Sequence, residues 1–225
     1  SSHLVRVRQV IEGARSSLDI AMYSFSDGSI LAALADAAAR GVRIRFLFEK
    51  ANRDKSHPEG TWSAKLEDRG IDVRYINKIM HHKFLIADGA VDTVDAAYTG
   101  TLVTGSGNWS TWAGTFYDEN TVVLSGSGEL LLRFQREFNR LWENSRDLAW
   151  SMPAEMIATR PIPGAVIVDD PAVDVAFTSD NFDVKTTRYG PTFSLVAGRD
   201  TVADTLVARI EAATESIHVA SGHLR

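Results

Sequence analysis

Residues 80–88 have the sequence MHHKFLIAD, in which two histidines and a lysine lead into a short apolar run. The apolar residues 84–87 end at a turn signal, Asp88 followed by glycine, so the segment predicts a buried strand next to a loop. Because side chains alternate along a strand, His81 and Lys83 are expected on one face. Asp88 lies an odd number of residues from both, so we expect it to face away and to have a structural role.

A histidine and a lysine on one face suit the chemistry of a phosphodiester. The positive charge of Lys83 opposes protonation of His81 and favours a neutral imidazole. Lys83 can then neutralise nonbridging oxygens while His81 attacks phosphorus, which divides one displacement into two easier steps through a covalent intermediate. A zinc site made of His81, His82 and Asp88 is excluded, because adjacent strand residues point apart and a catalytic zinc needs three converging protein ligands.

A second polar segment, residues 104–108 (TGSGN), follows the apolar residues 101–103. Its glycines allow the backbone to turn sharply and to come close to a ligand. Ser106 and Asn108 then offer hydrogen-bond donors to phosphate oxygens. Taken alone, the segment is explained equally well by an ordinary hairpin turn, and the neighbouring His-x-Lys favours the phosphate site.

Together the two segments resemble the phospholipase D superfamily, whose mark is His-x-Lys-x4-Asp (the HKD motif) followed by Gly-Ser-x-Asn. The matching residues are His81, Lys83, Asp88, Gly105, Ser106 and Asn108. The resemblance covers residues 4–148 and includes the segments 21–25, 118–123 and 134–142. One departure is the spacer of 16 residues at 89–104, which is longer than in many members, so we expect an insertion around 91–100.

The resemblance implies roles for the site residues. His81 is the nucleophile that forms a phosphohistidine, and Lys83 and Asn108 hold the phosphate together with Ser106. A carboxylate at the position of Glu119 orients a histidine through its other ring nitrogen. The remaining motif residues are structural, namely Asp88 and Gly105. The resemblance implies neither a metal nor another cofactor.

The chain also contains an internal repeat. Residues 11–21 (IEGARSSLDIA) align with residues 210–220 (IEAATESIHVA), and each segment is typical of a helix end, a tight turn and a buried strand. The alignment places His223 opposite Ser24, at a strand end where the resemblance puts pocket lining. His223 is therefore a candidate for substrate or phosphate binding.

The expected domain organisation is a phospholipase D-like catalytic repeat at 1–148, a linker at 149–176 and the truncated start of a second repeat at 177–225. Four of the six prolines lie within the linker, and such a segment tends to run over the surface in extended form.

Two-step phosphoryl transfer needs an acid for the leaving alkoxide and a base for the incoming water. Proteins that resemble this chain take a second histidine from a second copy of the motif. The sequence has no second His-x-Lys. We expect the second histidine from a C-terminal repeat beyond Arg225 or, alternatively, from a second chain across a dimer axis.

The pattern over the whole chain predicts an α/β fold. Helices are expected at 4–15, 28–40, 61–69 and 128–145, and strands at 18–24, 42–48, 71–76, 83–87, 101–105 and 120–124. This alternation indicates a phospholipase D-like layered fold, with a mixed β-sheet flanked by helices. Asp27 is expected to cap the helix that begins at residue 28, and Gly41 to end it.

Composition and charge restrict the function classes. The 225 residues are 44% hydrophobic, enough for one sizeable core and the start of another. The net charge of −5 argues against a protein that coats nucleic acid nonspecifically. No apolar run approaches the roughly 20 residues that span a bilayer, so a soluble protein is expected. The absence of cysteine excludes disulfides but leaves the compartment unknown, with secreted and cell-envelope locations both open.

These features predict a metal-independent phosphodiesterase of the phospholipase D type, which hydrolyses or transfers a phospholipid head group. Two alternatives stay open, an endonuclease or phosphodiesterase that acts on DNA or RNA and a noncatalytic phosphate-binding module. Trp109 and Trp112 fit either a substrate wall or core packing. We expect His82 to be buried and hydrogen-bonded, and His3 to be uninvolved.

Overall fold

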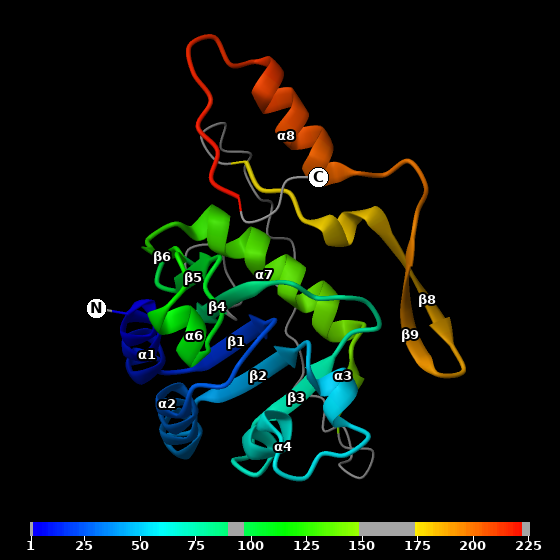
Figure 1. Cartoon of the computed structure of the whole chain (residues 1–225). Coiled ribbons are helices and arrows are strands. Elements are labelled where there is room, and N and C mark those ends of the chain that lie inside the picture. Colours follow the sequence, from blue (N-terminus) through cyan, green and yellow to red (C-terminus); the bar gives the residue numbers. More distant parts are fainter. Residues whose placement is uncertain (1, 90–96, 149–173, 222–225) are drawn as a thin grey trace.

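The computed structural model describes residues 2–89, 97–148 and 174–221 (Figure 1). The helices are α1 (His3–Gly13), α2 (Gly28–Ala39), α3 (Ala51–Asp54), α4 (Trp62–Glu67), α6 (Thr111–Thr115), α7 (Gly128–Glu143) and α8 (Thr201–Glu211), with a 3₁₀ turn at Thr178–Asn181. The strands are β1 (Ser17–Met22), β2 (Arg43–Phe48), β3 (Asp72–Tyr75), β4 (Lys83–Ala87), β5 (Thr101–Gly105), β6 (Thr121–Ser125), β7 (Arg146–Asp147), β8 (Phe182–Thr187) and β9 (Gly190–Leu195).

A seven-stranded mixed sheet in the order β6-β5-β4-β1-β2-β3-β7 forms the centre of the described structure. β1, β2 and β3 are parallel, whereas β4 runs antiparallel to β1, β5 to β4, and β6 to β5. The carboxyl ends of β1 and β5 therefore lie at the same edge of the sheet as the amino ends of β4 and β6. The predicted α/β class with a mixed sheet is confirmed.

Helices cover both faces of this sheet (Figure 1). On one face α1 and α2 pack against β1 through side chains such as Ile11 and Leu34, which meet Leu18 and Ile20. On the other face α7 packs through residues such as Phe138. Burial on both faces makes the central strands mostly apolar, and the buried charges of Asp19 on β1 and Arg45 on β2 form an ion pair of 2.6 Å.

The ends of α2 follow the predicted chemistry. The Asp27 carboxylate accepts hydrogen bonds from the backbone N–H groups of Ser29 and Ile30, each at 2.9 Å. Gly41 follows the helix with a φ of +88°, a conformation that glycine adopts without steric cost. Both caps are confirmed, and they direct the chain into β2, next to β1.

The C-terminal part contains an antiparallel hairpin of β8 and β9, whose Phe193 packs into the same core cluster as α7, and it continues into α8 (Figure 1). Residues 214–221 have no regular structure. In the first unit, α1 and β1 completely bury the apolar residues Val7, Ile11, Leu18 and Ile20. Their counterparts in the aligned segment are all more than half exposed, namely Leu206, Ile210, Ile217 and Val219. The segment thus presents an apolar face that no described residue covers.

Among the helices of the described residues, none combines the length and the apolar character that a membrane crossing requires.

Candidate functional site

The two halves of the motif meet at one edge of the sheet. Met22 at the end of β1 pairs with Lys83 at the start of β4. Gly105 at the end of β5 pairs with Thr121 at the start of β6, and Thr104 pairs with Phe84 on β4. The strand register therefore brings the halves together although a long spacer separates them in the sequence.

His81 and Lys83 are in direct contact. The Lys83 Nζ lies 3.0 Å from Nδ1 and 3.3 Å from Nε2 of His81, and it donates to the His81 carbonyl oxygen at 2.8 Å. His81 and Lys83 lie together as expected, but they do not share a strand face. β4 begins at Lys83, so His81 lies in the preceding loop, and the lysine side chain rather than a shared strand face joins the two groups.

The electrostatics favour a neutral imidazole beside a cation. Burial, and then the nearby charges of Lys83 and His82, lower the pKa of His81 below its ordinary value. Burial also lowers the pKa of Lys83 to about 8, while the carboxylate of Glu119 opposes this effect. Near neutral pH, His81 therefore has a lone pair available and Lys83 still carries its proton. The effect of Glu119 on Lys83 places that carboxylate at the same site.

The polar loop after β5 is held by contacts with Asn120. Ser106 and Gly107 donate their backbone N–H groups to the Asn120 carbonyl oxygen at 3.1 and 3.4 Å, and the Ser106 Oγ accepts from the backbone N–H of Asn120 at 3.0 Å. Gly105 has a φ of +152°, and a Cβ there would lie 2.2 Å from that carbonyl oxygen. Only glycine fits this position, which fixes the direction in which Ser106 leaves the strand.

Asn108 joins this loop to the end of β1. Its Oδ1 accepts the backbone N–H of Ser24 at 3.2 Å, and the next residue, Trp109, donates its N–H to the Ser24 carbonyl oxygen. With its oxygen engaged in this way, the Asn108 amide group is oriented, and its NH₂ is the part that remains to serve a ligand.

Asp88 lies at the far end of β4, away from His81. Its Oδ1 accepts the backbone N–H groups of Ser16 at 2.7 Å and of Arg15 and Ser17 at 3.0 and 3.1 Å, together with the Ser16 hydroxyl at 2.9 Å. Burial opposes ionisation, but these hydrogen bonds outweigh it and lower the pKa of Asp88 below its ordinary value. The carboxylate thus fastens the turn between α1 and β1 to the end of β4.

The carboxylate of Glu119 makes no hydrogen bond to a histidine among the described residues. Glu119 precedes β6, and it acts on the site through the effect of its charge on Lys83. His223, the other candidate for substrate binding, lies outside the described residues, as does most of the predicted insertion around 91–100.

Two side chains at the site were not found by sequence reasoning. The Nε2 of His3 lies 3.0 Å from the Asn108 carbonyl oxygen, and the imidazole ring packs on Gly107, so His3, which was expected to be uninvolved, contacts the motif loop. The ring of Tyr23 lies against His81. The contact of His3 with Asn108 spans 105 residues, and no local sequence pattern signals such a contact.

Three residues next to the motif, His82, Trp109 and Trp112, differ in how far they are buried. The Nε2 of His82 pairs with a Glu137 carboxylate oxygen at 3.0 Å, and Ser179 donates its hydroxyl to the other oxygen at 2.6 Å. His82 is therefore hydrogen-bonded as expected, but it is half-buried rather than buried. Trp109 is buried in the core, whereas Trp112 is 62% exposed. Core packing therefore explains only the first of the two tryptophans.

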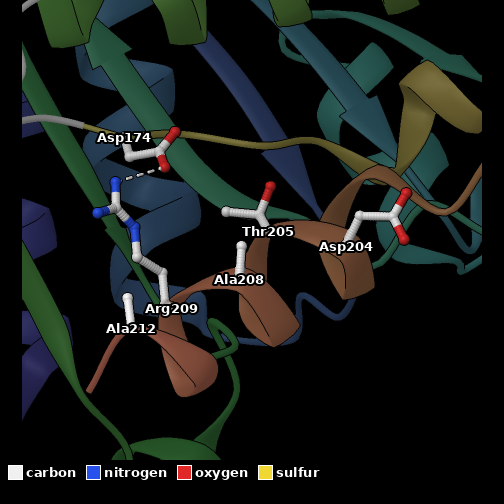
Figure 2. A pocket seen from close by; sticks show the side chains of 6 residues that line it. All are labelled: Asp174, Asp204, Thr205, Ala208, Arg209 and Ala212. Atoms are coloured by element: carbon white, nitrogen blue, oxygen red, sulfur yellow. Dashed lines mark hydrogen bonds and ion pairs between the residues drawn. The ribbon is translucent and has the colours of Figure 1, made fainter. Parts of the chain in front are cut away.

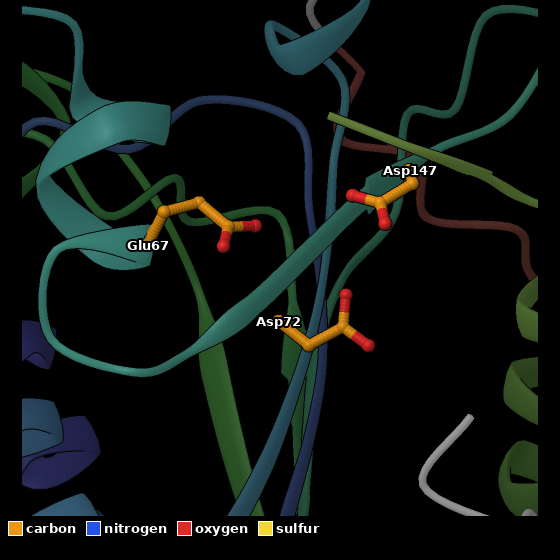
Figure 3. Close-up of side chains that lie close together, drawn as sticks. All are labelled: Glu67, Asp72 and Asp147. Carbon is orange, nitrogen blue, oxygen red and sulfur yellow. The ribbon is translucent and has the colours of Figure 1, made fainter. Parts of the chain in front are cut away.

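Two further groups of side chains lie apart from the motif. A cavity beside α8 is lined by Asp174, Asp204, Thr205, Ala208, Arg209 and Ala212, of which Asp174 and Arg209 form an ion pair of 2.8 Å (Figure 2). Glu67, Asp72 and Asp147 form an acidic cluster whose ligand atoms lie within 4.8 Å of one another (Figure 3). Asp72 begins β3, so the cluster lies at the sheet edge opposite the motif. The Arg74 Nε lies 3.3 Å from the Asp72 Oδ1 and supplies a positive charge to the cluster.

Comparison with known proteins gives one family. A family model described as cardiolipin synthase, PLD-like domain, matches residues 7–142, which include both halves of the motif. The mitochondrial cardiolipin hydrolase of Homo sapiens is 34% identical over 144 residues, which cover 63% of this chain and 52% of that protein. The protein of the same name from Chlamydomonas reinhardtii is 32% identical over 142 residues, or 62% of this chain and 57% of that protein. The chain thus spans less than two thirds of the length of these relatives.

Solved structures agree with this result. A phospholipase D family member, Nuc from Salmonella typhimurium, has a TM-score of 0.52 and 26% identity, and the match covers 64% of this chain and 89% of that one. NucT from Helicobacter pylori has a TM-score of 0.50 with 20% identity and the same two coverages, and it is similar in fold.

Proposed function

Since the chain belongs to the cardiolipin synthase, PLD-like domain family, and with it to the phospholipase D superfamily, we propose that it is a phosphodiesterase acting on a phospholipid. The observation that carries the proposal is the contact of 3.0 Å between Lys83 Nζ and His81 Nδ1, beside the loop of Ser106 and Asn108. A nucleophile, a cation and oriented polar groups converge there at one sheet edge. The names of the relatives, mitochondrial cardiolipin hydrolase, favour a phospholipid as the substrate.

In the first step, a lone-pair nitrogen of His81 attacks phosphorus. The N–P bond forms as the bond from phosphorus to the alcohol oxygen breaks, and the departing alkoxide takes a proton from an acid. Lys83, Ser106 and Asn108 stabilise the charge on the nonbridging oxygens. In the second step, a base removes a proton from water, the water oxygen attacks the phosphohistidine, and His81 is released. An alcohol in place of water gives transfer instead of hydrolysis, and neither step requires a metal.

The acid and base of these two steps are proposed to be a second histidine, from a C-terminal repeat or from a second chain. The apolar face of α8 and residues 217–219 supports a C-terminal repeat as the source. Each exposed apolar residue of this face aligns with a residue that is buried in the first unit. In this organisation residues 1–148 form the catalytic unit and residues 177–225 begin a second one. The role proposed for Glu119 is to orient one of the two active-site histidines.

A nuclease is the second candidate, and one feature favours it. Lys50, Arg53 and Lys55 lie in and around α3, which directly follows the carboxyl end of β2, at the motif edge of the sheet. Cations in this position suit a polyanion whose phosphates extend beyond the reacting one.

In the test, the full-length protein is incubated with vesicles that contain cardiolipin and, separately, with single-stranded and double-stranded oligonucleotides. The released products are then measured. We expect lipid cleavage that His81→Ala abolishes, that the matched surface variant His57→Ala retains, and that EDTA leaves unchanged. Cleavage of oligonucleotides alone would replace the phospholipid with the nuclease function. Binding of either substrate without product would favour a noncatalytic phosphate-binding module, and loss of activity in EDTA would contradict the metal-free mechanism.

A further inference from the structure

Tyr23 follows the last residue of β1 and lies at the centre of the motif edge. Its backbone N–H donates to the carbonyl oxygen of His82 at 2.9 Å, which continues the pairing of β1 with β4 by one step. The side chain is half-buried. This position fixes the tyrosine backbone directly beside the chain segment that carries His81.

The ring of Tyr23 contacts both reactive groups. Its centroid lies 4.2 Å from that of the His81 imidazole, with an angle of 57° between the planes, and the Lys83 Nζ lies 5.0 Å from the same centroid. Tilted aromatic pairs and cations within about 6 Å of a ring face are both attractive arrangements. Because Lys83 also contacts His81, the three side chains form a closed set in which each one contacts the other two.

His81 needs such support more than an ordinary strand residue does. It precedes β4, and it is only partly covered by its neighbours. Its flanking backbone is held at Met80, whose N–H donates to Glu49 Oε2 at 2.7 Å, and at the His82 carbonyl. These bonds fix the backbone and leave the imidazole free to rotate about its side-chain torsions. Among the described residues, the contacts that restrain the imidazole itself come from Tyr23 and Lys83.

We propose that Tyr23 is a positioning residue, whose ring face holds the imidazole of His81 and the ammonium of Lys83 in the arrangement needed for attack on phosphorus. The inference rests on the proposed function, in which His81 is the nucleophile. A nucleophile already held near its attack geometry loses less rotational freedom on the way to the transition state, so the effect is expected in kcat.

The same contacts make the proposal measurable without a substrate. Burial and the charge of Lys83 both oppose protonation of His81. On the proposal, the Tyr23 ring supports both effects, because it lies against the imidazole and against Lys83. Among the described residues, the other titratable groups that act on this pair are His82, which also lowers the pKa of His81, and Glu119, which acts on Lys83. Removal of the ring should therefore raise the pKa of His81 toward its ordinary value, whereas removal of the hydroxyl alone should not.

The test compares Tyr23→Leu, which removes the ring, with Tyr23→Phe, which keeps it, in the full-length protein. His81 is followed by NMR titration of its ring carbon and proton signals, assigned by their loss in His81→Gln, and kcat and KM are measured with the cleaved substrate. We expect Tyr23→Phe to retain the native titration and kcat within about threefold. Tyr23→Leu should raise the pKa of His81 and lower kcat about 10- to 100-fold with little change in KM.

A native titration and a native kcat in Tyr23→Leu would overturn the proposal. Equal losses in Tyr23→Phe and Tyr23→Leu would overturn it as well, because the hydroxyl rather than the ring would then be responsible. Circular dichroism checks that each variant folds, and Tyr23→Met replaces Tyr23→Leu if the latter does not. The titration needs no turnover, so it tests the ring contact even if no phosphodiester is cleaved and the proposed function itself fails.

Discussion

The removal of the Asp88 carboxylate is a direct test of how the motif supports the fold. One carboxylate oxygen accepts three backbone N–H groups and one hydroxyl from residues 15–17. Asp88 also has a φ of +56°, a conformation that Asp and Asn tolerate better than other residues with a side chain. Asp88→Ala removes the hydrogen-bond acceptor and places a residue that tolerates positive φ less well. Asp88→Asn keeps a residue that tolerates positive φ and keeps one neutral acceptor oxygen.

The expected cost follows from these contacts. A hydrogen bond to a charged group contributes about 1.5–3 kcal/mol, and bonds that share one carboxylate do not add fully. Since Asp88 is only half-buried, solvent replaces part of the loss. We expect Asp88→Ala to lower the free energy of unfolding by about 3 kcal/mol, of which about 1 kcal/mol is the backbone conformation. Asp88→Asn should cost about 1–1.5 kcal/mol.

Urea unfolding at several pH values is the assay. The pKa of Asp88 is depressed in the folded state, so its contribution is fully present above the ordinary pKa and is lost as the pH falls through the depressed one. The difference in stability between the native chain and Asp88→Asn should therefore be constant from about pH 5 to 7 and shrink below about pH 4. A cost of under about 0.5 kcal/mol for Asp88→Ala, or a difference that does not change with pH, would contradict this role of Asp88.

Three other predictions concern the loop, the cation and the second unit. Gly105→Ala should destabilise the protein by about 2–4 kcal/mol in urea unfolding, because its Cβ would clash with Asn120, and a neutral result would contradict the loop geometry. Since the pKa of Lys83 is lowered to about 8, kcat/KM should fall above pH 8 as the ammonium loses its proton, and a flat profile there would exclude the role of Lys83. In the full-length protein, the amides of residues 217–220 should exchange with solvent as slowly as those of residues 17–20, and rapid exchange would count against a second unit.

The sequence predicted the fold best where local signals are strong. The strands at 83–87 and 101–105 have the predicted bounds, because each is a short apolar run next to a turn signal. The sequence did not predict α6, because its five residues are too few to show a helical repeat of apolar residues. Ser110 caps this helix and accepts the Ala113 N–H at 3.3 Å. The β8-β9 hairpin was also missed, although the glycine at its turn, Gly190, was a readable signal.

At the site, the sequence predicted the residue types better than their contacts. The spacing of His-x-Lys suggested a shared strand face, yet the contact depends on the lysine side chain reaching back to a loop residue. Tyr23 and His3 enter the site from β1 and α1, so only the sheet register and the packing of α1 bring them there. Such long-range contacts are set by tertiary structure, and a pattern within ten residues cannot contain them.

The aligned segments at 11–21 and 210–220 also show that a local sequence pattern does not by itself determine tertiary structure. The helical halves both form, because the hydrogen bonds of a helix lie within its own segment. The strand halves differ, because a strand is stabilised by its neighbours: β1 lies between β2 and β4, whereas residues 217–220 have no strand beside them in the described part of the chain. Similar sequences therefore give a buried strand in one place and an exposed apolar segment in the other. The exposed segment is accordingly the place where a second repeat or a second chain would add both burial and the histidine that the proposed reaction needs.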